Sequence, residues 1–265
     1  MSLKNAVRMA RLNSRITPKL QSWLTKHPEG VKVTDPAIMK KVEDILMGVS
    51  KSRAGAFHPS QLYQCPRAQV YGYYDVPTVR EFNPQLQNIF NDGHFRHLRW
   101  QITLLEAGIL TDVEVPVYDP INRIEGSMDG VNSKENWMFE LKGTSQFRQV
   151  QQRGALPAHI KQVHAYLFVS GIPEAIILYE DKSTQQWHEI TVQRDETIIG
   201  EIKGILEELN YSVDNDTLPE RYEDCENQTG ATYNSCQYAS VCHRFNKPSE
   251  INTPVPIKRR ATKPK

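Results

Sequence analysis

The chain has few cysteines and no long apolar run, and each shortage excludes a class of protein. Four cysteines among 265 residues are too few for a disulfide-rich secreted scaffold, and thiols in a reducing cytosol rarely pair. No apolar stretch approaches the roughly 18–20 residues that are needed to cross a bilayer. The N-terminal segment MSLKNAVRMARLNSRITPKL lacks the continuous apolar core of a secretory signal. We therefore expect a cytoplasmic protein with no membrane partner.

The composition is that of an ordinary globular protein, with 39% hydrophobic and 24% charged residues. The length suits one elaborated domain with a sizeable core. The net charge is only +1, but no acidic residue precedes Glu29 and the tail over 258–265 is basic. Basic ends around an acidic interior suit a protein that attracts phosphates and holds metal ions. The alternative is a pair of solvated, partly disordered ends, which we favour for the tail alone.

The order of the apolar patterns predicts an α/β fold. The first fifty or so residues have a helical pattern with breaks near Pro36 and Gly48, a short helix is expected within 57–74, and a long one over 83–107. Alternating residues then predict strands at 113–117, 123–131, 137–142, 175–179 and 187–192. Two further helices are expected at 157–169 and 195–209, with a polar loop after the third strand.

An acidic pair and a lysine occur on the second and third predicted strands. Asp129 lies in GSMDGV, while Glu140 and Lys142 lie in MFELKGT. Side chains alternate along a strand, so Glu140 and Lys142 share a face and Leu141 points to the other side. A hairpin would bring Asp129 beside them. The simplest alternative is a surface hairpin with an ordinary Glu–Lys pair.

These residue types suit the hydrolysis of a phosphodiester. Mg²⁺ or Mn²⁺ prefers carboxylate oxygens, which Asp129 and Glu140 would supply, and the backbone carbonyl of Leu141 could add another ligand. Lys142 could orient or deprotonate the attacking water, or stabilise the negative charge that develops on the phosphate. The sequence leaves these roles open.

Three further side chains flank this motif. His97, in the segment GHFRH over 93–97, could offer a neutral imidazole to the metal, although His94 shares its helix face and a partly buried histidine is the simpler interpretation. Gln162 and Tyr166 are four residues apart on the predicted helix over 157–169, so both point to one face. They could hold DNA phosphates or water, whereas a tyrosine alone would more often face the core.

Four segments in this order resemble the motifs of RecB-family nucleases, which are of the PD-(D/E)XK type. GHFRH, GSMDGV, FELKG and QVHAY match that family's G-x-x-x-H, Asp, E-x-K and Q-x-x-x-Y. The resemblance implies a restriction-endonuclease-like core, with a mixed central sheet flanked by helices. It implies metal ligands at His97, Asp129 and Glu140, to which the carbonyl of Leu141 is added on chemical grounds. It also implies catalytic residues at Asp129, Glu140 and Lys142, with Gln162 and Tyr166 as the accessory pair of the catalytic site.

The cysteines extend the resemblance to the branch of this family that carries an iron–sulfur cluster, including AddB-type nuclease domains and CRISPR-associated RecB-like exonucleases. In that branch one cysteine precedes the nuclease core and three follow it, as Cys65, Cys225, Cys236 and Cys242 do here. The chain departs from the pattern at Tyr233, where the first cysteine of a C-x-x-C pair is expected. The resemblance implies a [4Fe–4S] cluster, with zinc as the alternative and four unconnected buried thiols as the simplest interpretation.

The resemblance implies a division of the chain. We expect an N-terminal helical region over 1–55, the first part of a cysteine-bound cap over 56–82, a nuclease core over 83–212, a cysteine region over 213–247 and a disordered tail over 248–265. The cap would link the N- and C-terminal regions.

The implied activity is a Mg²⁺- or Mn²⁺-dependent exonuclease on single-stranded or frayed DNA, in recombination, repair or CRISPR-adaptation-like processing. A recombination or helicase protein is a possible partner, and the host would be a bacterial, archaeal or phage-infected cell. The alternatives are a structure-specific endonuclease, a non-catalytic DNA-binding scaffold, and a zinc-stabilised nucleic-acid binder.

Overall fold

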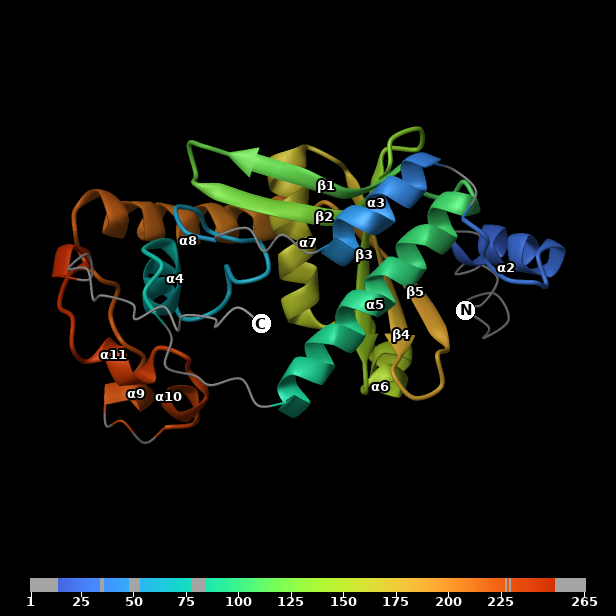
Figure 1. Cartoon of the computed structure of the whole chain (residues 1–265). Helices are drawn as coiled ribbons and strands as arrows, with labels where there is room; N and C mark the ends of the chain where they lie inside the picture. The colour runs from blue at the N-terminus through green and yellow to red at the C-terminus, as the bar shows by residue number, and fades with distance from the viewer. Residues whose placement is uncertain are drawn as a thin grey trace, which may run out of the picture.

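The protein is an α/β structure with one five-stranded mixed sheet, as the sequence predicts (Figure 1). The computed structural model describes residues 14–33, 36–47, 53–77, 84–226, 228 and 230–250. The strands, which lie in the sheet in their sequence order, are β1 (Asp112–Asp119), β2 (Ile124–Asn132), β3 (Trp137–Thr144), β4 (Glu174–Asp181) and β5 (Trp187–Gln193).

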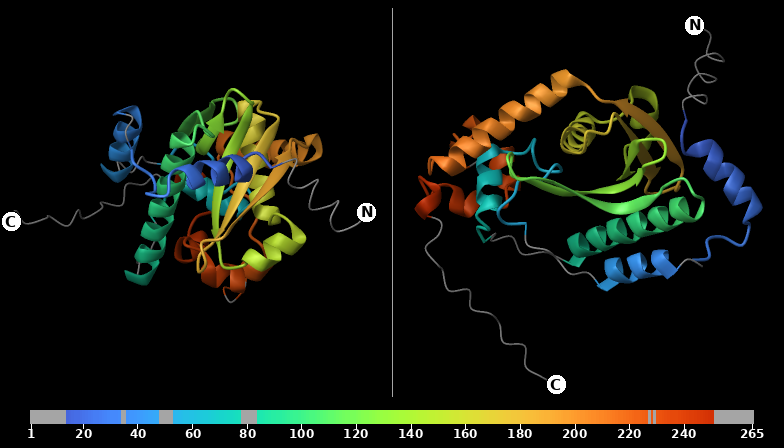
Figure 2. Two further views of the ribbon diagram at one scale, coloured as in Figure 1. Left: turned by 90° about the vertical axis from the view of Figure 1, so that its right-hand side faces the viewer. Right: turned by 90° about the horizontal axis from the view of Figure 1, so that it is seen from above.

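Helices cover both faces of this sheet (Figure 2). Those before and within the sheet are α2 (Thr17–Lys26), α3 (Pro36–Met47), α4 (Pro66–Tyr73), α5 (Pro84–Glu106), α6 (Phe147–Arg153) and α7 (Pro157–Ser170). Those after it are α8 (Glu196–Asp214), α9 (Glu223–Glu226), α10 (Ala231–Ser235), α11 (Ala239–Cys242) and the 3₁₀ turn η1 (Pro248–Glu250).

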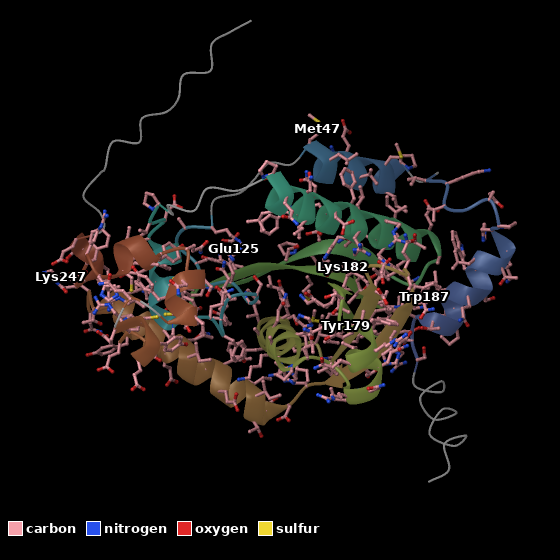
Figure 3. All side chains as sticks on the ribbon, turned by 90° about the horizontal axis from the view of Figure 1, so that it is seen from below. Met47, Glu125, Tyr179, Lys182, Trp187 and Lys247 are labelled. Atoms are coloured by element: carbon pink, nitrogen blue, oxygen red, sulfur yellow. The ribbon has the colours of Figure 1, made fainter. Side chains whose placement is uncertain are left out.

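The core has one layer on each side of the sheet. Apolar residues of α2 and α5 pack on the face that carries Phe139 and Leu141, and Trp187 of β5 lies beside α2 (Figure 3). Residues of α6 and α7 pack on the opposite face, which carries Met138 and Tyr179. Because the side chains of β3 alternate, Glu140 and Lys142 lie on the α7 side. This confirms the predicted face of the Glu–Lys pair.

The two halves of the sheet separate between β2 and β3. These strands pair only at the three positions next to their hairpin, of which Gly130 with Phe139 is the last. Beyond this point β2 continues as an antiparallel ribbon with β1, while β3 runs parallel to β4. The residues that would pair next are Asp129 and Glu140. The carboxylates therefore lie where the sheet opens.

The C-terminal segment packs against the segment that precedes α5. The amphipathic helix α8 buries Ile202, Leu206 and Leu209 against α4 and α7. Tyr71 of α4 then packs with Tyr238 from the connection between α10 and α11. Segments far apart in the sequence thus form one body (Figure 1).

The predicted elements differ from the observed ones in a few places. The segment after β3 is not entirely loop, because Phe147 and Val150 are buried and form one side of α6. Pro36 begins α3 rather than only ending a helix, which its fixed φ permits at a first helical position. The expectations for Gly48, for residues 1–13 and for the tail over 251–265 concern positions outside the described residues. Within the described ranges, no helix is both long and apolar enough to cross a bilayer.

Candidate active site

Asp129 is held at a point where β2 pairs with neither neighbouring strand. The pairing of β1 with β2 omits Glu114 and Asp129, and Glu114 has a positive φ of 49°. The backbone carbonyl of Asp129 instead accepts a hydrogen bond from Nε2 of Gln101 on α5, at 2.9 Å. Its carboxylate Oδ2 accepts a second one from the backbone N–H of Leu141, at 2.7 Å. These two bonds fix the side chain beside β3.

Glu140, Lys142 and Gln162 form a closed set of contacts. Nζ of Lys142 lies 2.8 Å from Oε1 of Glu140 and donates to Oε1 of Gln162 at 2.8 Å. Nε2 of Gln162 donates to Oε1 of Glu140, also at 2.8 Å. The lysine ammonium has three N–H groups, so one of them is left for a substrate or a water molecule. The structure thus brings Gln162 to the predicted Glu–Lys pair.

Glu140 is almost fully buried, with 3% of its surface exposed. Burial and the neighbouring charge of Asp129 raise the pKa of Glu140 to about 7. Its second oxygen, Oε2, is buried and has no hydrogen-bond partner among the described residues. A buried oxygen without a donor is costly, and a cation is the ligand that would offset this cost.

His97 reaches Asp129 from α5, with Nδ1 at 3.2 Å from Oδ1. Burial alone would lower the pKa of His97, but the carboxylate of Asp129 outweighs it and the pKa is raised. The imidazole is 35% exposed, so a substrate can approach it. The structure therefore groups His97 with the carboxylates as predicted. His94, by contrast, is exposed.

Tyr166 lies on α7 one turn after Gln162 and is 5% exposed. Burial, together with the charges of Glu140 and Asp129, raises its pKa well above the usual range, so the phenol keeps its proton. Its ring lies against Gly126 of β2, where an added Cβ would be 3.1 Å from Cε1 of Tyr166 and 3.0 Å from Cδ of Pro59. A glycine is therefore needed for β2 to approach α7.

The oxygen and nitrogen atoms at this site are of the types that bind a hard divalent cation, although they are not arranged in metal-coordinating geometry. The carboxylates of Asp129 and Glu140 are the preferred ligands of Mg²⁺ and Mn²⁺, and Oε2 of Glu140 is open. In the parts of the chain that the structure describes, no group of three or more His, Cys, Asp or Glu side chains has metal-holding geometry. Nδ1 of His97 faces Asp129 instead. The side chain of Leu141 is buried on the other face of the sheet.

The four cysteines lie around one small pocket between α4 and the C-terminal helices. Cys65, Cys225, Cys236 and Cys242 all contribute to its wall, and its volume is about 20 Å³. Burial raises the pKa of the Cys65 thiol, and Cys236 and Cys242 are near enough to raise it further. The four thiols thus lie around a common pocket, and none of them forms a disulfide. As for the carboxylates, no three of these thiols have metal-holding geometry in the described chain.

Tyr233, at the position where a further cysteine is expected, lines the same pocket. Its ring contacts His243 edge-on, with the ring centroids 6.0 Å apart, and His243 bonds to the backbone carbonyl of Cys225 at 3.1 Å. The two aromatic side chains thus hold Cys225 at the pocket. Cys225 reaches this position from further upstream than a C-x-x-C pair would allow.

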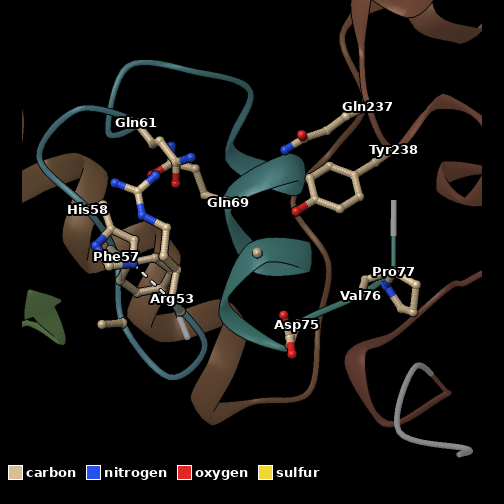
Figure 4. A pocket seen from close by; sticks show the side chains of 12 residues that line it. Arg53, Phe57, His58, Gln61, Gln69, Asp75, Val76, Pro77, Gln237 and Tyr238 are labelled. Atoms are coloured by element: carbon tan, nitrogen blue, oxygen red, sulfur yellow. Dashed lines mark hydrogen bonds between the residues drawn. The ribbon is translucent and has the colours of Figure 1, made fainter. Parts of the chain in front are cut away.

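A larger cavity of about 330 Å³ lies beside this region (Figure 4). Its wall includes Arg53, Gln69, Asp75 and Tyr238. Gln69 is 6% exposed, and its Nε2 donates to the carbonyls of Leu62 and Gln64. Its Oε1 is buried and has no hydrogen-bond partner among the described residues. No motif in the sequence predicts this cavity.

Two residues near the site were not predicted from the sequence. Gln101 of α5 holds the backbone of Asp129, and its only signal is that it lies four residues after His97. His159 lies three residues before Gln162, on the same face of α7, and bonds to Tyr179 at 2.8 Å. That spacing could have identified His159.

No protein-family model matches the sequence, and no curated protein matches it significantly. Among solved structures, the alkaline exonuclease LHK-Exo from Laribacter hongkongensis has a TM-score of 0.47 and 19% identity, over 62% of this chain and 90% of that one. Its complex with dAMP gives a TM-score of 0.48 and 18% identity over the same shares. The protein SSO0001 gives 0.45 and 19%, over 76% of this chain and 94% of that one. Structural similarities with a TM-score below 0.5 and an identity below 25% establish neither the fold nor the activity of this protein.

Proposed function

We propose that this protein is a metal-dependent deoxyribonuclease of the PD-(D/E)XK type that hydrolyses phosphodiester bonds. The observation that supports it is the convergence of Asp129, Glu140, Lys142 and Gln162 where the sheet opens, with one oxygen of Glu140 unpartnered. An ordinary surface hairpin would leave its Glu–Lys pair in solvent. Here the carboxylate is buried, Lys142 and Gln162 contact only Oε1, and a bound cation or a proton would compensate Oε2.

The ligands of the cation would be Asp129, Glu140 and His97, with the backbone of Leu141 as a further candidate. When bound, it would supply Lewis acidity for the phosphate and a lowered pKa for the attacking water. Lys142 is oriented by Glu140 and Gln162, and its remaining N–H would donate to a phosphate oxygen or to the attacking water. Protonated Tyr166 would act as a hydrogen-bond donor rather than a base.

The substrate would be DNA with a free end, single-stranded or frayed, which the protein would digest as an exonuclease in the cytoplasm. This part of the proposal rests on the motif resemblance. The process would be recombination, repair or CRISPR-adaptation-like processing, alone or with a recombination or helicase partner. A structure-specific endonuclease with the same centre would cut without an end.

The pocket formed by the four cysteines would hold a [4Fe–4S] cluster, or zinc as the alternative. Soft thiolates suit both, and all four side chains reach the same pocket. When bound, the group would cross-link residue 65 to the C-terminal region. The thiolates would have to rearrange around it, since no three of them have metal-holding geometry in the described chain.

Purified protein is incubated with end-labelled linear single-stranded DNA and with a closed circle of the same sequence, in Mn²⁺ or in EDTA. We expect degradation of the linear strand in Mn²⁺ only. Cleavage of the circle would overturn the exonuclease assignment and retain the nuclease. An intact linear strand in Mn²⁺ would contradict the proposed function and favour a DNA-binding scaffold.

A further inference from the structure

A histidine that the motifs do not include lies next to the lysine of the proposed site. His159 is in the first turn of α7, three residues before Gln162 and seven before Tyr166, so the three side chains share one helix face. The positive charge of Lys142 is near enough to lower the pKa of His159. His159 is half-buried and lies at the edge of the site rather than in the core.

Tyr179 favours one tautomer of His159 over the other. It lies on β4 directly beside Lys142, on the side of the sheet that faces α7 (Figure 3). Its hydroxyl oxygen accepts a hydrogen bond from the backbone N–H of Leu156 at 3.1 Å and lies 2.8 Å from Nδ1 of His159. Burial raises the pKa of Tyr179, so the hydroxyl keeps its one proton. The arrangement that gives both groups a partner has this proton donated to Nδ1 of His159.

In this arrangement His159 is a neutral imidazole with its proton on Nε2. Burial first, and Lys142 second, lower the pKa of His159 to about 4, so it stays uncharged around neutral pH. Nε2 makes no hydrogen bond to the described part of the chain, and it is not sealed from solvent. A neutral imidazole does not act as a general acid in this range, but it donates a hydrogen bond.

We propose that Nε2–H of His159 binds a backbone phosphate oxygen of the DNA strand, forming with Lys142 a phosphate subsite that positions the strand. The subsite rests on the proposed function. Phosphate oxygens only accept hydrogen bonds, so they match a site that presents one ammonium N–H and one imidazole N–H. Because His159 is neutral, it adds a directed hydrogen bond without a second cation beside Lys142.

The test compares His159→Ala, His159→Gln and wild type, with His27→Ala at the C-terminal end of α2, on the opposite face of the sheet, as the control. We expect His159→Ala to slow cleavage of linear single-stranded DNA roughly 10- to 100-fold, the range for a lost hydrogen bond to a charged group. His159→Gln should recover most of the rate, since its amide N–H replaces Nε2–H. His27→Ala should cleave DNA at the wild-type rate.

A set of oligonucleotides with one methylphosphonate each, as separate diastereomers, locates the contact. At the phosphate that His159 contacts, the methylphosphonate should slow cleavage by the wild type. The same substitution should slow cleavage by His159→Ala only a little further. Equal rates for His159→Ala and wild type would overturn the subsite. So would a His159→Gln variant as slow as His159→Ala, because packing alone would explain that result.

Binding to the same oligonucleotides, followed by fluorescence anisotropy with Ca²⁺ in place of Mn²⁺, separates this inference from the proposed function. If the wild type does not cleave DNA but His159→Ala weakens binding and His159→Gln does not, the subsite stands and the nuclease proposal fails. If cleavage requires Glu140 but neither assay responds to His159, the nuclease proposal stands and the subsite fails.

Discussion

At the scale of single residues, Glu140 carries the largest electrostatic conflict in the site. It is buried beside the carboxylate of Asp129, and Lys142 with Gln162 satisfies only one of its oxygens. Its pKa of about 7 lies above the value of 4.5 for a free glutamate. The folded protein without metal therefore binds a proton at Glu140 that the unfolded chain releases.

The first prediction concerns stability against pH in EDTA. Because the folded pKa of Glu140 is raised, its contribution to stability is complete below pH 4.5 and declines as the pH rises to about 7. Glu140→Gln keeps the shape but cannot titrate, so its unfolding free energy should fall less over this interval. Urea unfolding of both proteins at several pH values measures this. If the unfolding free energies of the two proteins changed with pH in parallel, Glu140 would have the same pKa in the folded and unfolded states, which would contradict the prediction.

The second prediction concerns Gly126, which brings β2 close to Tyr166. A methyl group there would meet Pro59 and Tyr166 at about 3.0 and 3.1 Å, so Gly126→Ala should cost about 1–3 kcal/mol. Gly204→Ala in α8 is the control, since no atom lies within 4 Å and alanine favours helices by about 1 kcal/mol. Thermal unfolding should shift down for the first and up for the second. A stable Gly126→Ala would mean that β2 can move away from α7.

At the scale of elements, α5 is anchored to the sheet one turn from His97. Glu180 at the end of β4 is fully buried and accepts from Nη2 of Arg99 at 2.5 Å and from Nε1 of Trp100 at 2.6 Å. Nη1 of Arg96 lies 3.1 Å from the same carboxylate. Three donors of one helix thus depend on a single acceptor.

The third prediction is that Glu180→Ala destabilises the protein by about 1–3 kcal/mol, because it leaves Nε1 of the buried Trp100 without its acceptor and leaves Arg96 with Asp92 alone. Glu207→Ala, an exposed glutamate of α8, should change stability by less than about 0.5 kcal/mol. Urea unfolding measures both. Equal stabilities would show that water replaces the carboxylate and that α5 is held by apolar packing alone.

The sequence was sufficient to predict the helices, strands and shared faces that depend on the spacing of nearby residues. Strand alternation was enough to place Glu140 and Lys142 on one face, and helical spacing was enough to place Gln162 and Tyr166 together. It could not predict the opening of the sheet at Asp129, since that depends on which strands continue to pair. Nor could it predict Gln101 or Tyr179 as partners of site residues. Those contacts join α5 to β2 and β4 to α7, across long sequence separations.

At the scale of the whole molecule, α4 and the C-terminal helices are joined by two kinds of contact. Arg67 donates to the backbone carbonyls of Pro219 and Phe245, and Tyr71 packs against Tyr238. The cysteine pocket lies beside these contacts. A cluster or a zinc ion there would tie residues 65 and 242 together.

The fourth prediction is that anaerobically purified protein contains iron with visible absorbance, or else zinc, and that Cys242→Ser loses the metal. Because a cross-link between distant segments restricts the unfolded chain, the variant should also unfold at a lower temperature. Ser235→Ala, an exposed neighbour in α10, should keep both metal and stability. A metal-free wild type, together with an unchanged Cys242→Ser, would show that the pocket is only a set of buried thiols.

The most direct test of the nuclease centre is the cleavage rate of end-labelled single-stranded DNA in Mn²⁺ for wild type, Glu140→Ala, Lys142→Ala and Lys134→Ala. Lys134 is an exposed lysine of the β2–β3 hairpin and serves as the matched control. We predict cleavage by wild type and Lys134→Ala, and none by the other two variants while they remain folded. Undiminished cleavage by Glu140→Ala would contradict the assignment, because the activity would then come from another site or another protein.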